Sequence, residues 1–85
     1  MTQDSGTIVV IEDDPDIADL LDLYLRRDGY RVLLASDGLR GIDLVRQNQP
    51  KMVILDVGLP GGMDGLDVCR TLRATSSVAI MMLTA

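Results

Sequence analysis

Four continuous apolar runs alternate along this chain with three segments whose apolar residues recur every three or four positions. Short continuous apolar runs are typical of strands that are covered on both faces of a parallel sheet. Apolar residues at intervals of three and four are typical of amphipathic helices. The alternation therefore predicts an α/β fold: an open, doubly wound parallel sheet of four strands, with connecting helices on both faces. The expected strands contain residues 8–11, 32–35, 52–55 and 78–83, and the helical stripes are Ile17, Leu20, Leu21, Tyr24 and Leu25, then Leu39, Ile42 and Val45, then Leu66, Cys69 and Leu72.

Residues at the ends of the helical segments agree with this division. Asp37 and Asp64 stand where N-caps belong, because an aspartate oxygen there can accept a hydrogen bond from a free backbone amide. Gly29 and Asn48 stand where left-handed C-caps belong. No linker, repeat or low-complexity segment interrupts the 85 residues, so we expect a single domain over residues 1–85.

Charge and composition exclude several classes of function. Acidic residues outnumber basic ones 13 to 8, the net charge is -5, and no lysine or arginine cluster could follow a phosphate backbone, so this chain alone should not bind nucleic acid. Neither a signal peptide nor an apolar run long enough to span a bilayer is present, so no membrane association is expected. The single cysteine, Cys69, lies on an apolar stripe and is expected to be a buried small hydrophobe, which fits a reducing, cytosolic setting.

Polar residues at the ends of three expected strands carry the functional signal. Glu12 and Asp13 follow the first strand, Asp56 follows the third, and Thr84 follows the fourth. The carboxyl ends of parallel strands meet at one edge, so these side chains should converge. Three close carboxylates repel one another, which favours a raised pKa on one of them or a bound cation. With no histidine in the chain, oxygen ligands favour Mg²⁺, which commonly binds together with a phosphate and so indicates phosphoryl chemistry.

Two further acids in the same stretch have a structural interpretation. Asp14 precedes Pro15, and an N-cap acid followed by proline at the first helical position is a helix-start signal. Asp16 lies in the first turn, where the helix dipole favours any acid. The acids of residues 12–16 are therefore expected to divide into a metal site and a helix cap.

Four short motifs occur in a fixed order along almost the whole chain: IVVIEDD at residues 8–14, VILDVGLP at 53–60, MDG at 63–65 and MLTA at 82–85. Each is weak alone, but the ordered set resembles the receiver domain of two-component response regulators. The resemblance implies the flavodoxin-like receiver fold and a cytoplasmic signalling role. It also implies that the chain is a phosphoacceptor that assists its own phosphoryl transfer and is not an enzyme.

The resemblance assigns a role to each polar residue at the carboxyl edge. Asp56 would take a phosphoryl group from the phosphohistidine of a sensor histidine kinase and become an aspartyl phosphate. Asp13 and Asp56 would bind Mg²⁺ directly, and Glu12 would hold it through water. Gly58 would offer its backbone carbonyl to the metal.

The same resemblance places two donors on the phosphoryl group. The Thr84 hydroxyl would hydrogen-bond the phosphoryl oxygens, and its reorientation would be the switch. The backbone amide of Ala85 would add a second donor.

The loop after the acceptor departs from the family pattern. Pro60 keeps its usual place, but Met63 comes one residue late, so Gly62 is interpreted as an insertion. Because glycine tolerates positive φ, we expect the loop to absorb the extra residue without moving Gly58.

The chain also ends earlier than the family pattern, which makes it a (βα)3β fragment. Members of the family continue with a helix, a strand that ends in a lysine contacting the phosphoryl group, and a last helix. The single lysine, Lys51, precedes the third strand and should lie at the opposite end of the sheet. The strand from Val78 to Leu83 would then be an open apolar edge, and we expect homo-oligomer formation through it.

Two alternative functions and one longer parent are considered. A phosphorylation-silent receiver that acts as an interaction module is the main alternative, because the usual lysine is missing. An aspartyl-phosphate phosphatase of the haloacid dehalogenase type is disfavoured, because that family places a second acid where Gly58 stands. The helix and strand sequences resemble regulators of transcription with a C-terminal winged-helix domain, so DNA binding is expected only of such a longer parent.

Overall fold

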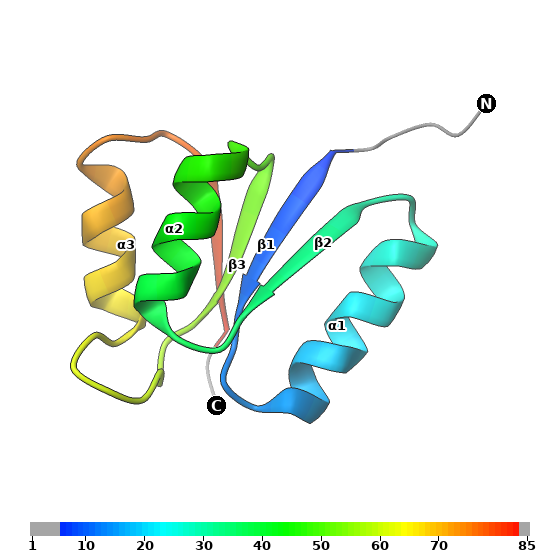
Figure 1. The fold of residues 1–85 in the computed structure, drawn as a ribbon, viewed down its shortest axis with the longest axis horizontal. Coiled ribbons are helices and arrows are strands. Elements are labelled where there is room, and N and C mark those ends of the chain that lie inside the picture. Colours follow the sequence, from blue (N-terminus) through cyan, green and yellow to red (C-terminus); the bar gives the residue numbers. More distant parts are fainter. Residues whose placement is uncertain (1–5, 84–85) are drawn as a thin grey trace.

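The computed structural model describes residues 6–83, and within that stretch seven elements follow one another in strict β-α alternation (Figure 1). The predicted α/β class is confirmed, and the predicted strands differ from the observed ones by a residue or so at their ends. None of the described helices has both the length and the apolar character needed to cross a membrane. The elements are β1 (Thr7–Ile11), α1 (Pro15–Arg27), β2 (Arg31–Ala35), α2 (Gly38–Asn48), β3 (Met52–Asp56), α3 (Gly65–Arg73) and β4 (Ala79–Leu83).

The sheet has the strand order β2-β1-β3-β4, and all of its pairings are parallel. The chain leaves β1 for β2 on one side and then returns to place β3 on the other side, so the strand order reverses between β1 and β3. Helix α1 packs on one face of the sheet, while α2 and α3 lie side by side on the other face (Figure 1). The doubly wound architecture is therefore confirmed, and its switch point lies between the carboxyl ends of β1 and β3.

The core divides into two apolar clusters, one on each face of the sheet. Alternate residues of the central strands enter the two clusters, as the pleat requires. Val9 and Val53 enter the larger cluster with residues of α2 and α3, and Val10 enters the smaller one with Leu21 and Leu25 of α1. These faces supply the apolar burial that holds the strand ends in place.

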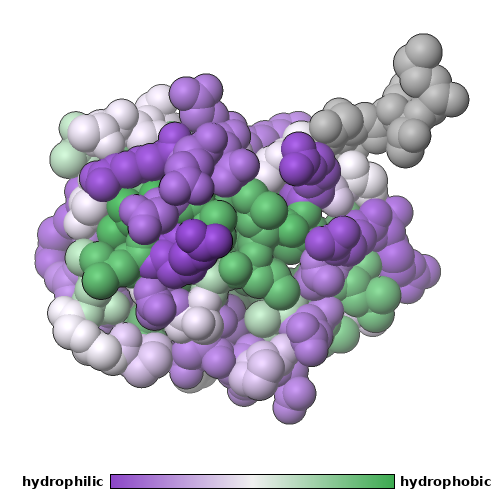
Figure 2. Space-filling model, viewed as in Figure 1, coloured by the Kyte–Doolittle hydropathy of each residue, from purple (hydrophilic) through white to green (hydrophobic). Residues whose placement is uncertain are grey.

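The expectation that all four strands are covered on both faces is wrong for β2 and β4. Leu34 of β2 is 40% exposed and Met81 of β4 is 51% exposed. Both strands lie at the edges of the four-stranded sheet formed by residues 6–83, and the three described helices cover mainly β1 and β3. Apolar surface is accordingly visible over the strands between α2 and α1 (Figure 2).

The helix N-caps are confirmed, and one C-cap is corrected. Asp37 accepts a hydrogen bond from the Arg40 amide, and Asp64 forms a reciprocal capping box with Asp67. Gly29 has a φ of 93°, as its C-cap prediction requires. The left-handed residue after α2 is Gln49 and not Asn48, which remains helical while its side-chain amide donates to the Leu44 carbonyl.

The helix faces also differ in part from the predicted stripes. In α3 the buried residues are Gly65, Val68 and Leu72, whereas Leu66 is 47% exposed and Cys69 is half-buried against the core. In α2 Leu39 is exposed, and in α1 three of the predicted residues are exposed while Ala18 is buried. The apolar residues of each helix lie on more than one face. The face that carries small residues is the one that packs against the core, because small residues let the backbones approach closely. The exposed residues of α1 are Ile17, Leu20 and Tyr24.

Candidate metal centre

Three carboxylates meet at the carboxyl edge of the sheet, where the strand order reverses. Glu12 and Asp13 directly follow β1, and Asp56 is the last residue of β3. Their ligand oxygens all lie within 4.8 Å of one another. The structure thus brings together three of the four side chains that the strand ends predicted, while Thr84, like Ala85, lies outside the described residues.

Glu12 is the buried member of the cluster, with 5% of its surface exposed. One of its carboxylate oxygens accepts a hydrogen bond from the Asp14 amide at 3.1 Å. Burial raises the pKa of the Glu12 carboxyl above its ordinary value, and the neighbouring Asp56 and Asp13 raise it further, against the lowering effect of the Asp14 amide. The ionised form of Glu12 is therefore destabilised by its surroundings, and a cation bound to the cluster would stabilise it.

Asp56 is held by its own loop and by the neighbouring strand. Its Oδ1 accepts a hydrogen bond from the Gly58 amide at 3.0 Å. The next residue, Val57, donates its amide to the Leu83 carbonyl of β4 at 3.1 Å. The carboxylate is partly exposed, so it is both oriented by the backbone and accessible to a ligand.

The donor set of the cluster fits a hard cation. All of its ligand atoms are carboxylate oxygens, and the sequence contains no histidine. Oxygen-only sites of this kind suit Mg²⁺, Mn²⁺ or Ca²⁺ and not zinc or copper. The three residues can therefore hold a metal ion.

The arrangement of an acidic cluster at the switch point of a doubly wound sheet agrees with a family match. The sequence model of the response regulator receiver domain matches residues 8–85. The chain belongs to the response regulator receiver domain family. The predicted resemblance is thereby confirmed, together with the flavodoxin-like receiver fold.

Curated relatives of this receiver domain include DNA-binding response regulators. The regulator MtrA of Mycolicibacterium smegmatis is 47% identical over 78 residues, and MtrA of Mycobacterium tuberculosis H37Rv is 46% identical over 78 residues. Each alignment covers 92% of this chain and 34% of the relative. The chain thus spans about a third of the length of these relatives.

Solved receiver domains share the fold closely. The BeF3-activated N-terminal receiver domain of Klebsiella pneumoniae RstA has a TM-score of 0.86 and 36% identity, over 92% of this chain and 66% of that one. The response regulator TrrA of Thermotoga maritima, solved in complex with Mg(2+)-BeF, has a TM-score of 0.87 and 32% identity, over 93% of this chain and 69% of that one. This chain therefore shares the receiver fold of these solved domains over the aligned residues.

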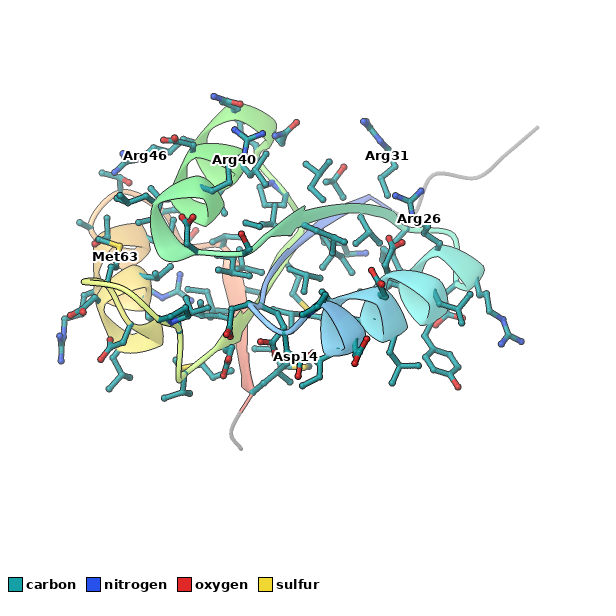
Figure 3. All side chains as sticks on the ribbon, turned by 60° about the horizontal axis from the view of Figure 1, so that its bottom comes forward. Asp14, Arg26, Arg31, Arg40, Arg46 and Met63 are labelled. Atoms are coloured by element: carbon teal, nitrogen blue, oxygen red, sulfur yellow. The ribbon has the colours of Figure 1, made fainter. Side chains whose placement is uncertain are left out.

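The helix cap of the receiver domain lies beside the cluster but outside it. Asp14 is the N-cap of α1 and accepts a hydrogen bond from the Asp16 amide at 2.9 Å, with Pro15 at the first helical position. Figure 3 shows Asp14 at one end of α1, with Arg26 near the opposite end. The predicted division of this acidic stretch into a cluster and a cap is confirmed in its geometry.

The loop between β3 and α3 contains Gly62, which the sequence pattern indicated as an insertion. Gly61 has a φ of 88°, and an added Cβ at Gly61 or Gly62 would meet nothing within 4 Å. Leu59, by contrast, is 5% exposed and anchors the loop in the larger core cluster. Gly61 and Gly62 therefore lie in an open part of the loop, while the buried Leu59 side chain anchors the segment next to Asp56.

Lys51 lies at the amino end of β3, as the sequence predicted. Its amide donates to the Thr7 carbonyl at 2.8 Å, and its Nζ lies 5.9 Å from the centroid of the Tyr30 ring. The single lysine of the sequence is therefore placed at the end of the sheet opposite to the acidic cluster.

Sequence reasoning missed two contacts of the site. The sequence indicated a role only for the carbonyl of Gly58, whereas the structure shows that its amide donates a hydrogen bond to Asp56 Oδ1. Gly65, which the motif MDG contains, donates its amide to the Val57 carbonyl at 3.0 Å. The glycine in that motif was the available signal, although its contact depends on how α3 approaches the loop.

Proposed function

We propose that this chain is the phosphoacceptor domain of a two-component response regulator, and that Asp56 takes a phosphoryl group from a sensor histidine kinase in a Mg²⁺-dependent reaction. The observation that carries the proposal is the cluster of Glu12, Asp13 and Asp56, whose ligand oxygens lie within 4.8 Å of one another. Membership of the receiver family supports the reaction class. The RstA receiver domain was solved in a BeF3-activated form and TrrA in complex with Mg(2+)-BeF, and both support the combination of a metal and a phosphoryl group at such a site.

The metal would be held by oxygen atoms from both central strands. Asp13 and Asp56 would bind it directly, Glu12 through a water molecule, and Gly58 through its backbone carbonyl. Mg²⁺, when bound, would neutralise charge on the incoming phosphoryl group and reduce its repulsion from the carboxylates. Burial of Glu12 favours this ion, because a cation compensates the charge that desolvation penalises.

Asp56 would act as the nucleophile. Its Oδ1 accepts a hydrogen bond from the Gly58 amide, so we assign the nucleophilic attack on phosphorus to Oδ2. A bond forms between Oδ2 and phosphorus, the phosphorus–nitrogen bond of the phosphohistidine breaks, and the released imidazole takes up a proton from solvent. Thr84 would hydrogen-bond the phosphoryl oxygens and serve as the switch, and the Ala85 amide would add a donor; both lie outside the described residues.

Intact-mass measurement with Mg²⁺ and a small phosphodonor tests the proposal. The wild type should gain the mass of one phosphoryl group, and hydroxylamine should remove it. Asp56→Asn should gain nothing, whereas Asp43→Asn, which removes an exposed carboxylate from α2, should behave as wild type. An adduct that persists in Asp56→Asn contradicts the assignment of the acceptor.

A phosphorylation-silent receiver is the second candidate, and the position of Lys51 favours it. Within residues 6–83 the lysine lies against the Tyr30 ring at the opposite end of the sheet, so it cannot supply a cation to a phosphoryl group on Asp56. The same mass experiment separates the two: a wild-type chain that stays unmodified at every Mg²⁺ and donor concentration supports the silent interaction module. The phosphatase alternative has no support in the family match.

The partner and output of the parent protein follow by analogy. We propose that this chain is cytoplasmic, that a sensor histidine kinase is its phosphodonor, and that its output is transcription regulation, because the relatives are named DNA-binding response regulators. This chain covers about a third of their length and carries a net charge of -5, so DNA contact is assigned to a separate domain. Phosphotransfer from a panel of purified kinase cores would identify the donor.

We also propose that the chain associates through the strand from Val78 to Leu83. Within residues 6–83, β4 pairs with β3 on one side, and Met81 on this strand is 51% exposed. An open apolar edge can pair with a second strand, and a charge on it prevents this. Met81→Lys should lower the average mass in sedimentation equilibrium, whereas Leu23→Lys on α1, where the side chain is 54% exposed, should not. A wild type that is monomeric at every concentration contradicts the proposal.

A further inference from the structure

Helix α3 begins in unusually close contact with the backbone that carries the acceptor. A Cβ added to Gly65 would lie against the carbonyl oxygen of Asp56, 2.7 Å from Cα of Val57 and 3.0 Å from the Asp56 carbonyl carbon. All three neighbours are backbone atoms, so no side-chain rotation can make room. Any residue other than glycine at position 65 must therefore move the start of α3 away from the loop or shift the backbone of Asp56.

This close approach allows a hydrogen bond that leads to the acceptor carboxylate. The Gly65 amide donates to the Val57 carbonyl at 3.0 Å. That carbonyl shares one peptide group with the Gly58 amide, which donates to Oδ1 of Asp56 at 3.0 Å. Because a peptide group is planar, fixing its carbonyl also fixes the direction of its N–H. The two bonds thus form a chain from α3 through one peptide to Asp56, and such chains are mutually strengthening.

Neighbouring contacts leave this peptide little freedom. The amide of Val57 donates to the Leu83 carbonyl of β4, so both peptide groups of Val57 are engaged. Beyond Gly58, the side chain of Leu59 is buried in the core. Gly58 is therefore held on both sides, and the contact from Gly65 is the one that sets the orientation of its amide.

We propose that Gly65 is a positioning residue for the phosphoacceptor site, because only hydrogen at its α-carbon lets α3 hold the Val57–Gly58 peptide that orients Asp56. The inference rests on the proposed function of Asp56. Its rival is plain close packing, in which Gly65 contributes to stability and to nothing else. Supporting groups around a metal or reactive carboxylate change affinity or rate by on the order of 10- to 100-fold, without an equivalent loss of fold.

Two other glycines of the chain serve as matched controls for Gly65→Ala. Gly41→Ala introduces an equally tight contact, against Cδ1 and Cγ1 of Ile11, but in the core between α2 and β1. Gly62→Ala adds a methyl group to open space in the same loop as the acceptor. The first control reproduces a tight contact that involves the Ile11 side chain and not the backbone of Asp56 or Val57, and the second reproduces a glycine substitution in the loop without a contact.

The experiment measures three quantities on the wild type and the three variants. They are the thermal midpoint, the Mg²⁺ affinity from titration of amide resonances, and the rate of modification by a small phosphodonor. The Gly58 amide resonance reports its hydrogen bond to Asp56 directly. We expect Gly65→Ala to weaken Mg²⁺ binding and slow modification by on the order of 10- to 100-fold and to shift the Gly58 resonance. Gly41→Ala should lower the thermal midpoint without these changes, and Gly62→Ala should change none of the three.

Each outcome decides the inference. Equal losses of Mg²⁺ affinity in Gly65→Ala and Gly41→Ala, or an unmoved Gly58 resonance in Gly65→Ala, would overturn it in favour of plain packing. If Gly65→Ala does not fold, amide hydrogen exchange in the wild type decides: protection at Gly65 far above that at Gly62 supports the bond, and equal exchange overturns it. A wild type that binds Mg²⁺ but is never modified refutes the proposed function alone, since affinity and resonance still test Gly65.

Discussion

Two adjacent aspartates offer the sharpest test of how the acidic stretch is divided. Asp13 belongs to the carboxylate cluster, and Asp14 caps α1. Asp13→Asn keeps the shape of the side chain and removes its charge, whereas Asp14→Ala removes the acceptor that satisfies the Asp16 amide. We expect the two substitutions to change the free energy of unfolding in opposite directions when Mg²⁺ is absent.

The magnitudes follow from the geometry. Two unit charges 4.8 Å apart repel by about 1 kcal/mol in water and by about 3 kcal/mol at an effective dielectric constant of 20. Asp13 is exposed, so the value for water is appropriate, and its two pairs give a gain of roughly 1 to 2 kcal/mol for Asp13→Asn. Loss of the N-cap in Asp14→Ala should lower the free energy of unfolding by about 1 kcal/mol. For a domain of this size, each of these corresponds to a shift of about 4 to 8 °C per kcal/mol.

Thermal unfolding followed by far-ultraviolet circular dichroism, with and without Mg²⁺, measures both effects. Mg²⁺ at about a hundred times its dissociation constant should stabilise the wild type and Asp14→Ala by about 2.7 kcal/mol. Asp13→Asn should gain stability without the metal and lose most of the response to it. Shifts of the same sign in the two variants, or a full Mg²⁺ response in Asp13→Asn, would refute the division into a metal site and a cap.

Three further predictions concern burial and capping. The pKa of Glu12 is raised in the folded chain, so Glu12 ionises first in the unfolded chain as pH rises from about 4.5. Without metal, the free energy of unfolding of the wild type should therefore fall over the range from about 4.5 to the raised pKa. Urea titrations should show that Glu12→Gln removes this fall. Asp64→Ala should lower stability by about 1 kcal/mol in urea, and an unchanged midpoint would contradict its capping role. Leu72→Ala should lower the free energy of unfolding by about 2 to 5 kcal/mol and Leu66→Ala by no more than about 0.5 kcal/mol, because Leu72 is buried and Leu66 is exposed. Similar losses in the two variants would contradict the observation that α3 packs on the core through the face that carries Leu72.

The strands were predictable because their apolar residues are continuous and the pleat buries both sides of β1 and β3. Which face of each helix packs against the sheet was less predictable. In α3, Leu66 and Val68 are both apolar, and periodicity alone cannot say which of two adjacent stripes meets the sheet. Gly65 decides it, because a residue without a side chain lets that face approach the loop.

The acidic cluster was predictable because the carboxyl ends of parallel strands lie at one edge of the sheet, and the observed order places β1 beside β3. The backbone contacts of the same site were not. The amides of Gly58 and Gly65 are present in every possible conformation, and only the path of the loop determines which acceptor each one meets. The left-handed Gln49 was missed for a similar reason, since the expected Asn48 uses its side chain inside the helix.

A single backbone amide joins the carboxylate cluster to the helix cap. The Asp14 amide donates to the Glu12 carboxylate, while the Asp14 carboxylate accepts the Asp16 amide. The first bond favours the ionised form of Glu12 and so lowers its pKa against the effect of burial. Because that bond uses the backbone of Asp14 and the cap uses its side chain, the two functions share a residue without sharing an atom. Removal of the side chain should therefore loosen the start of α1 and still leave Glu12 oriented toward a cation.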